Sequence, residues 1–415
     1  MTNQSRRSFL KGSLASAATV ASASFVTQAY AQPRAKVPAK WDETVDVIVV
    51  GSGFAGLAAA IEAKKAGANV VVLEKMPTPG GNSIINGGIL TATGCPQQLK
   101  HGIKDSVDLL AQDILVAGAY LNSPEKVRVL AEHALSNYEW TVKELGVEYN
   151  QDAIGQEGGH SVPRYVFTKN GSGSGIVNKE LEKLKALGVE VRLRTYVDHI
   201  IRDESGRVVG LEVREGYRFP KEGSGKVKFI AAKKGVILCY GGFSADVKFR
   251  SMHDPKLTDK FSTTNQPGAT AELWRETANI GCAVIQSDWI QCGPWSNPKE
   301  KGMGIGWTFT QSAAAEYGLW VNTKGKRFVN ELANRKVRAD AIFAEEAKGL
   351  KAVAIANQYG ADKLEAARPG VMKKLVEPNI VSKYDTLEAL AKDFQIPVEE
   401  LKKSIAQVND PRRPR

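Results

Sequence analysis

The chain has 415 residues, 43% of them hydrophobic and 24% charged, so it can bury a large core and is predicted to divide into two or more domains. Its formal net charge of +11 is spread along the sequence, which argues against nucleic acid and leaves an acidic redox partner or an anionic substrate open. Four cysteines without a CxxC or CxxCH pattern, and histidines without a partner pattern, predict neither a metal site nor a covalent haem. Cys95, Cys239 and Cys282 lie next to glycines or apolar runs and are predicted to be small buried hydrophobic residues.

The first 31 residues have the three parts of an export signal. Arg6 and Arg7 precede Phe-Leu-Lys, a stretch rich in Ala and Ser follows, and the segment ends on the small-x-small sequence Ala29-Tyr30-Ala31. This arrangement resembles a twin-arginine signal, a route that carries folded proteins. The apolar stretch is too short and too rich in Ser and Thr to span a membrane. The sequence therefore predicts a periplasmic protein that is not membrane-spanning and whose mature net charge is about +8.

The next segments alternate between strand and helix. In order, the sequence predicts a Pro- and Lys-rich linker, a buried parallel strand, a helix and a second strand, over residues 32–44, 45–50, 57–66 and 68–75. Residues 105–146 are predicted to be largely helical, with Asn122-Ser123-Pro124 starting a second helix. A glycine-rich turn over 171–175 precedes a helix over 176–187.

Further strands and a change of composition follow. Residues 188–215 are predicted to form strands joined by a Glu-Ser-Gly turn, and residues 233–243 a buried strand that ends in a glycine pair. The alternation predicts an α/β fold with a sheet domain over 45–285. The stretch over 286–408, rich in Gly, Trp and Pro and then helical, is predicted to be a second domain, and 409–415 a basic tail.

A dinucleotide-binding motif lies between the first strand and the first helix. Gly51, Gly53 and Gly56 form GxGxxG, in which glycines permit a tight turn, approach of the main chain to a pyrophosphate, and close packing of helix on strand. Glu74 ends the next strand, where an acid can bind ribose hydroxyls. Together these features predict a dinucleotide site, although the motif alone does not separate NAD from FAD.

The residues after the acid favour FAD. Gly80-Gly81-Asn82-Ser83 and then Gly87-Gly88 provide a second stretch of bare main chain near the phosphates and ring. A nicotinamide domain would instead continue directly into its next helix.

The sequence at this point resembles the flavoprotein subunits of fumarate reductases and soluble flavocytochromes c. The resemblance rests on the segment from Val47 to Ser83, on "GVILCYGGF" and "TTNQPGAT", and on "VNTKGKRFVNE", and it extends over roughly 43–409. It implies non-covalent FAD, held by a Rossmann-like FAD-binding domain over 45–285 with an inserted α+β capping domain over 286–408. The residues expected around this FAD are Gly51, Ser52, Gly53, Ala55, Gly56, Glu74, Lys75, Gly80, Gly81, Asn82, Ser83, Gly87, Gly88, Val197, Gly241 and Gly242. Tyr240 stands where the family commonly has Thr, next to the last glycine pair.

The expected reaction is reduction of the C=C bond in an unsaturated acid. Such a site needs cations that hold the carboxylate and an acid that protonates carbon. The resemblance implies that Arg335 holds the carboxylate and donates the proton, and that Thr310 binds the substrate. A surface position for Arg335 stays open, because a guanidinium is a reluctant acid.

Several family residues are replaced in this chain. By spacing, Gln311 and Ala314 occupy the positions of the family's relay carboxylate and second arginine, and Gly293 occupies that of a substrate histidine. Fumarate itself is therefore not expected. A larger or less charged acceptor is favoured, with aromatic stacking on nearby tryptophans or plain packing of those tryptophans as alternatives. Tyr317 is predicted either to replace the missing acid or to be a core residue.

Three functions remain open from the sequence. The leading one is an exported FAD-dependent reductase of an unsaturated acid, supplied by a separate periplasmic carrier such as a cytochrome c or an FMN protein. The second is a non-catalytic FAD-binding subunit or pseudoenzyme, because the chain is expected to lack the family's last flavin-domain segment. The third is an oxidase or dehydrogenase of the related aspartate-oxidase or ketosteroid-dehydrogenase type. The segments "NQPGAT" and "GKRFVNE" weigh against this third function.

Overall fold

The computed structural model describes residues 35–409 apart from 157 and 301, so the predicted signal and nearly all of the basic tail lie outside the described residues. The chain folds into two compact units, and neither is continuous in sequence. Unit 1 is formed by the described residues up to Gly81 together with Glu180–Gly242 and Thr270–Gln286. Unit 2 is formed by Asn82–Lys179, Phe243–Ala269 and the chain from Ser287 onward. Thus two segments that the sequence assigns to the FAD-binding domain pack in unit 2.

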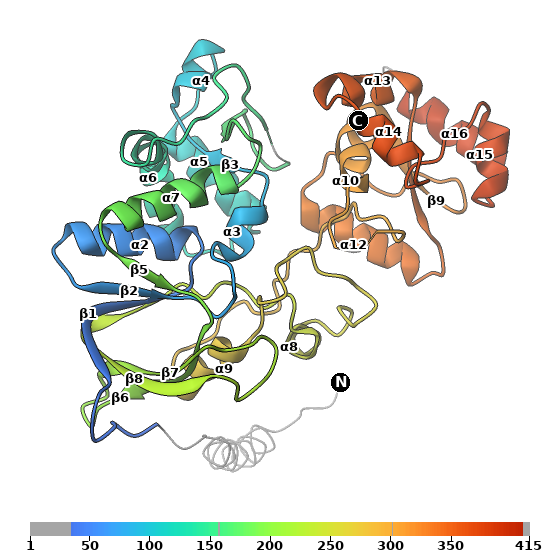
Figure 1. Ribbon diagram of the computed structural model, residues 1–415. Coiled ribbons are helices and arrows are strands. Elements are labelled where there is room, and N and C mark those ends of the chain that lie inside the picture. The colour runs from blue at the N-terminus through green and yellow to red at the C-terminus, as the bar shows by residue number, and fades with distance from the viewer. Residues whose placement is uncertain (1–34, 157, 301, 410–415) are drawn as a thin grey trace, which may run out of the picture. The chain divides into compact units, whose positions relative to one another are not determined.

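Unit 1 is built on one mixed sheet (Figure 1). Its elements are β1 (Glu43–Val50), α2 (Phe54–Lys65), β2 (Val70–Leu73), β5 (Glu190–Arg192), β6 (Thr195–Arg202), β7 (Val208–Glu215), β8 (Lys226–Leu238) and α9 (Glu272–Asn279). The strand order is β5-β2-β1-β8-β7-β6, with the first four strands parallel and the last two antiparallel. Register is set by pairs such as Val49 with Val72 and Val49 with Ile237.

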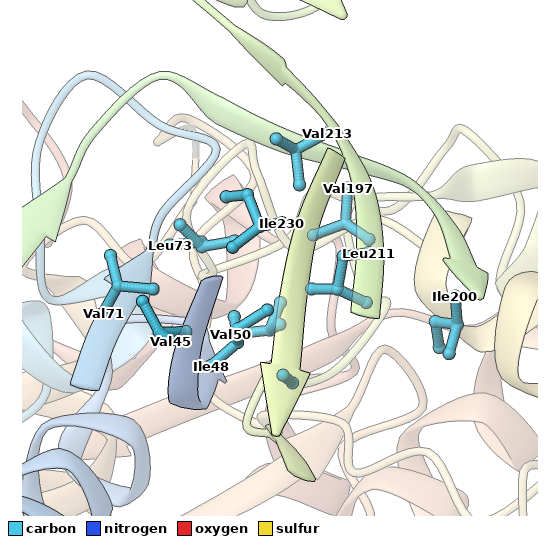
Figure 2. Packing of buried hydrophobic residues seen from close by; sticks show 11 residues of the cluster. Val45, Ile48, Val50, Val71, Leu73, Val197, Ile200, Leu211, Val213 and Ile230 are labelled. Atoms are coloured by element: carbon cyan, nitrogen blue, oxygen red, sulfur yellow. The ribbon is translucent and has the colours of Figure 1, made fainter. Parts of the chain in front are cut away.

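Apolar side chains from both halves of this sheet form the core of unit 1 (Figure 2). The cluster contains Val45, Ile48, Val50, Val71, Leu73, Val197, Ile200, Leu211, Val213, Ile230 and Ala232. All residues of β2 are buried, which explains why its sequence is a continuous apolar run instead of an alternating one. Burying each such side chain contributes about 1.5–3 kcal/mol, so this cluster fixes the strand ends that carry the turns described below.

Strand β8, the last strand of this sheet along the chain, is less buried than the sequence predicts. Residues 226–238 form β8, but Lys233 and Lys234 are exposed and Ile237 is 37% exposed. The reason is that β7 pairs with β8 only as far as Ala231. Beyond that point, among the described residues, β8 has a neighbouring strand on one side only.

Unit 2 contains most of the helices. Its first part comprises β3 (Ile89–Thr91), α4 (Pro96–Lys100), α5 (Val107–Ala117), α6 (Pro124–Lys143), β4 (Tyr165–Phe167) and α8 (Val247–His253). The short helix α3 (Gly81–Ile85) and α7 (Ser174–Ala186) lie at junctions between the units. As predicted, α6 starts after Ser123, whose hydroxyl accepts from the Lys126 amide, and Pro124 takes the first helical position.

The second part of unit 2 surrounds a two-stranded antiparallel sheet. Its elements are α10 (Gly306–Thr308), the π-helix η1 (Phe309–Ala314), α11 (Ala315–Tyr317), β9 (Gly318–Asn322), α12 (Arg335–Glu346), β10 (Ala352–Ala356), α13 (Gln358–Ala367), α14 (Val371–Val376), α15 (Leu387–Asp393) and α16 (Val398–Val408). Leu319 and Val321 of the sheet pack with Ala391 and Leu401 of the last helices. A π-helix is rare and is often found near functional sites.

The predicted α/β fold class is confirmed. One expectation for the cysteines is wrong: Cys95 is buried as predicted, but Cys239 is only half-buried and Cys282 is exposed, because Cys282 follows the end of α9 instead of lying in a packed element. Among the described residues, no helix has both the length and the hydrophobicity that crossing a membrane requires.

Candidate dinucleotide and carboxylate sites

The turn between β1 and α2 is built on close approaches of the main chain. Gly51 has a φ of +101°, which favours glycine, and its amide donates to the Leu73 carbonyl at 2.8 Å. A Cβ at Gly51 would lie under 3.0 Å from the Cys239 carbonyl oxygen, and a Cβ at Gly56 would lie closer still to the Gly51 carbonyl oxygen. Both glycines are thus required by packing, as the motif predicts.

Glu74 connects this turn to the next glycine stretch. Its Oε2 accepts hydrogen bonds from the Ser52 hydroxyl at 2.6 Å and the Ser52 amide at 3.2 Å, and its Oε1 accepts from the Met76 amide at 2.9 Å. The Ser52 hydroxyl in turn accepts from the Gly80 amide at 2.9 Å. The polar groups of Ser52 therefore act inside the protein and hold the two turns together. Glu74 keeps further acceptor capacity, because a carboxylate has about four lone-pair positions.

The end of β8 lies beside the first turn. The Cys239 amide donates to the Val50 carbonyl at 2.8 Å, so the chains leaving β1 and β8 run together. Strands β2 and β8 lie on opposite sides of β1, so the order in which strands are added to the sheet reverses at β1. Open α/β sheets bind ligands at the carboxyl ends of the strands where the strand order reverses. Gly241 and Gly242 follow, and a Cβ on either would meet no atom within 4 Å. Their main chain has room for a ligand.

Helix α2 begins at the same edge of the sheet. Gly53 is its N-cap, no side chain caps it, and its first turn, which includes Ala55, holds no acidic residue. The amides and dipole at such a helix start attract an anion such as a pyrophosphate. Sheet edge, glycine turns and helix start therefore combine into a site suited to a dinucleotide.

Tyr240, the departure from the family's threonine, turns toward α9. Its hydroxyl lies 3.2 Å from the Thr277 hydroxyl, and its ring packs edge-on against Trp274. The Trp274 indole N–H donates to the Gly241 carbonyl at 3.1 Å. The larger side chain is thus accommodated within unit 1, where it helps to fix the glycine pair.

Two other predicted cofactor contacts have their side chains engaged elsewhere. The Lys75 ammonium donates to the Thr270 hydroxyl and lies 3.2 Å from the Glu272 carboxylate. Val197, on β6, has its side chain in the sheet core (Figure 2). If Lys75 or Val197 contacts a cofactor, we expect the contact to be made by its main chain.

The second glycine stretch starts at the boundary of the units. Gly81 has a φ of +47°, and a Cβ on it would meet no atom within 4 Å. In unit 2 the Asn82 side-chain oxygen accepts from the Gln266 amide at 2.7 Å, and the Ser83 carbonyl accepts from the Asn86 side chain at 2.7 Å. These hydrogen bonds to the Asn82 side chain and the Ser83 carbonyl stabilise the start of this stretch.

The two glycines that end this stretch, Gly87 and Gly88, have different surroundings. Gly87 is exposed, and its nearest neighbour would be the Ile89 side chain. Gly88 has a φ of +65°, and a Cβ there would lie under 3.0 Å from Thr168 and Ser172. The close approach of Thr168 and Ser172 is therefore enough to require glycine at position 88.

A cluster of cations and tryptophan forms the second candidate site, which lies within unit 2. Asn334 caps α12 by accepting from the Val337 amide at 3.0 Å, and this cap places Arg335 in the first helical turn. The Arg335 guanidinium lies 5.0 Å from the centre of the Trp295 ring and donates to the Gln291 side chain at 3.3 Å. Arg335 is half-buried and so remains accessible to an anion.

Arg338 completes this cluster, although no role was predicted for it. It is 1% exposed, lies 5.5 Å from the centre of the same Trp295 ring, and donates to the Gln311 side chain at 3.0 Å. The usable signal is its spacing, because residues three apart on a helix share a face. The structure thereby connects Gln311 with Arg335 through an arginine and an indole.

Thr310 and Tyr317 lie on neighbouring segments of unit 2. Thr310 is in the π-helix, directly before Gln311, and its hydroxyl donates to the Gly306 carbonyl at 3.3 Å. Tyr317 packs edge-on against Tyr359 of α13, and its side chain bonds to Glu316, whose carboxyl pKa is raised by burial. These contacts favour the packing interpretation of Tyr317.

The three tryptophans considered for aromatic stacking lie against different cations. Trp295 carries both arginines, whereas the Lys336 ammonium lies 5.4 Å from the ring centre of Trp289. Trp307 lies against Arg368, at 5.0 Å. These tryptophans support charged side chains, which argues against one shared aromatic pocket.

A buried ion cluster fixes the loop that contains His160. Arg164 is fully buried and donates to Asp105 at 3.0 Å and to Asp113. Burial opposes ionisation of both carboxyls, but hydrogen bonds, including those from Arg164, keep their pKa values below the usual range. At the other end of the loop, Gly158 leaves little space beside the main chain of Ala333, just before α12. The loop is therefore held beside the start of that helix.

Comparison with known proteins points in one direction. The sequence profile of a family described as an FAD binding domain matches residues 46–399. The acrylate reductase flavoprotein subunit of Shewanella woodyi is 41% identical over 98% of this chain and 79% of its own length. The urocanate reductase of Eggerthella lenta is 33% identical over 88% of this chain and 59% of its own length.

A solved structure agrees with these relatives. The open conformation of a flavocytochrome c3 fumarate reductase superposes with a TM-score of 0.69 at 29% identity, over 89% of this chain and 62% of the other. The chain thus spans about three fifths of this structure and of the urocanate reductase.

Proposed function

Because this chain belongs to the FAD-binding family that includes the acrylate, urocanate and fumarate reductase flavoproteins, we propose that it reduces the C=C bond of an unsaturated carboxylic acid. FAD is the cofactor of this family, and when bound it supplies the hydride. The reductive direction is supported by relatives named as reductases, which disfavours the oxidase or dehydrogenase alternative.

The residues of unit 1 fit a non-covalent FAD. Gly51 and Gly53 present bare main chain at the start of α2, where a pyrophosphate is favoured. Glu74 is positioned by Ser52 to accept hydrogen bonds from ribose hydroxyls. Gly241 leaves space beside the main chain at the end of β8.

The single observation that carries the substrate assignment is the pair of guanidinium groups on Trp295. Arg335, accessible at the start of α12, is proposed to bind the substrate carboxylate and to protonate carbon, with Thr310 as a further substrate contact. A guanidinium releases a proton reluctantly, so Arg335 must be reloaded from solvent or from a neighbouring group. Gln311 cannot return a proton to Arg335 as an acid, because a side-chain amide does not ionise at the pH values at which proteins work.

The proposed substrate is an unsaturated acid other than fumarate. Gly293, at the position of the family's substrate histidine, presents no charge to a second carboxylate, and a Cβ added there would lie 3.5 Å from the Trp295 indole. The relatives named for acrylate and urocanate support an acid with one carboxylate beside its double bond.

We also propose export and a separate electron donor. The twin-arginine pattern at Arg6 and Arg7 supports delivery of a folded, cofactor-loaded protein to the periplasm. Electrons would come from another redox protein, a cytochrome c or an FMN protein, because the sequence carries no CxxCH haem motif.

The test is reduction of a panel of acids by the full chain after reconstitution with FAD. With dithionite-reduced methyl viologen as donor, acrylate, urocanate and cinnamate are assayed beside fumarate. We expect turnover of at least one monocarboxylate and little or none of fumarate. Preferential turnover of fumarate would contradict the substrate assignment.

The second candidate function is a non-catalytic FAD-binding subunit. It is favoured by Gln311 and Ala314, neither of which can carry a proton as the family's residues do. Its signature is stoichiometric FAD binding with no turnover of any acid in the panel.

A further inference from the structure

Two arginines of unit 2 share one aromatic ring. Arg335 and Arg338 are three residues apart on α12, and their guanidinium carbons lie 5.0 and 5.5 Å from the centre of the Trp295 ring. Guanidinium groups stack well on an indole, because the ring face is negative and the group is planar. Trp295 is therefore a common support for both charges.

The two arginines differ in how firmly they are held. Arg338 is fully buried, and one of its nitrogens donates to the Gln311 side chain at 3.0 Å and to the Glu331 carbonyl at 3.1 Å. Its guanidinium also lies 5.7 Å from the centre of the Trp320 ring, on β9. Arg338 is thus fixed by the π-helix, by β9 and by the segment before α12.

Arg335 has a more open environment. It is half-buried, and the contacts described for it run to Trp295 and to the Gln291 side chain. The indole is thus one of the groups that position its guanidinium. The same indole also lies against the buried Arg338.

We propose that Arg338 is a positioning residue for Arg335. By holding Trp295 against α12, Arg338 sets the plane in which the Arg335 guanidinium meets a carboxylate. This inference rests on the proposed function, because it takes Arg335 as the carboxylate-binding group. Arg338 itself, being buried, acts through Trp295 and Arg335 and does not touch the substrate.

The test measures carboxylate binding apart from turnover. Acrylate is titrated into the oxidised, FAD-loaded full chain, and the dissociation constant is obtained by calorimetry. Arg338→Met is expected to weaken binding about tenfold, and Arg338→Lys to restore part of the loss, because a lysine keeps the charge but cannot stack in the same plane. Arg368→Met, which removes a comparable arginine from Trp307 in the same unit, is the matched control and should leave binding unchanged.

A double-mutant comparison separates positioning from general damage. If Arg338 acts through Arg335, then Arg338→Met has no further effect in a chain that already carries Arg335→Met. Equal weakening in both backgrounds would overturn the proposal, and so would unchanged binding by a folded Arg338→Met chain. Should Arg338→Met fail to fold, Gln311→Met removes one of its fixing contacts more gently and is expected to weaken binding about threefold.

The outcomes distinguish this inference from the proposed function. A chain that binds acrylate with the expected mutational pattern but turns over no acid would support the positioning role and contradict the reductase assignment. A wild-type chain that turns over acids while Arg338→Met leaves their binding and KM unchanged would do the opposite. Failure of the wild-type chain to bind any carboxylate would contradict both.

Discussion

At the carboxyl ends of β1, β2 and β8, the groups that would face a ligand belong to the main chain, whereas at the start of α12 they belong to side chains. Gly51 and Gly56 are required because neighbouring carbonyl oxygens leave no space for a Cβ. Arg335 and Arg338 are placed by an indole and by amide and carbonyl partners. Changes in the first region should therefore act on cofactor binding, and changes in the second on substrate binding and rate.

The largest expected effect is on rate, from Arg335→Met. Removing the guanidinium should lower kcat/KM for an unsaturated acid by about 10²–10³-fold, because the group that holds the carboxylate is lost. The flavin content of the purified chain should not change. Steady-state assays with reduced methyl viologen, normalised to bound flavin, measure this. A parallel loss of flavin would break the comparison between the two regions.

The next effect is on cofactor affinity, from Gly56→Ala. The added Cβ would meet the Gly51 carbonyl oxygen, and relief of such overpacking costs about 1–3 kcal/mol. We expect affinity for FAD to fall about 10- to 100-fold, as followed by flavin fluorescence. Gly235→Ala in β8 is the control, since its Cβ would meet nothing within 4 Å. If both variants retained flavin equally, the close approach would have no functional role.

Much of the first region is predictable from the sequence, and little of the second is. The GxGxxG spacing and Glu74 describe a main-chain geometry that short-range pattern determines. The hydrogen bond from Arg338 to Gln311 joins residues that are 27 apart in the sequence. Gln311 lies in a π-helix, which no local sequence pattern predicts. No sequence pattern indicates that the Tyr240 hydroxyl lies near that of Thr277, or that the Ser52 hydroxyl connects Glu74 with Gly80. Such contacts depend on packing between segments.

A third prediction contrasts two buried ionisable side chains. Arg338 has polar partners, whereas Glu180 of α7 is 1% exposed and its Oε2 has no hydrogen-bond partner among the described residues. Burial raises the pKa of Glu180 to about 9. The folded chain then keeps a proton that the unfolded chain releases above its ordinary value of 4.5, so stability falls as the pH rises from about 4.5 to about 9.

Replacing Glu180 should therefore stabilise the protein. Glu180→Leu, between the buried Val177 and Leu184 on the same face of α7, is expected to add about 1–3 kcal/mol, with a gain that grows from pH 5 to pH 9. Urea unfolding at several pH values measures it. Glu180→Gln cannot ionise and should remove the pH dependence while leaving a buried polar group. A gain that does not change with pH would show that Glu180 is already ionised.

The smallest expected effect comes from Tyr317→Phe. Because Tyr317 packs against Tyr359, loss of its hydroxyl should change kcat by no more than about threefold. A general acid contributes about 10²–10⁴-fold to a rate, so a fall of that size would identify Tyr317 as the proton donor instead. The dependence of kcat on pH in the two proteins distinguishes the cases further.

The most direct test of the account is a titration of the full chain with FAD and with NAD, followed by flavin absorbance and fluorescence. The glycine turns at β1 and β8 predict one tightly held FAD per chain, retained by Arg335→Met, weakened by Gly56→Ala, and not displaced by NAD. A chain that binds no FAD, or that prefers NAD, would contradict the account.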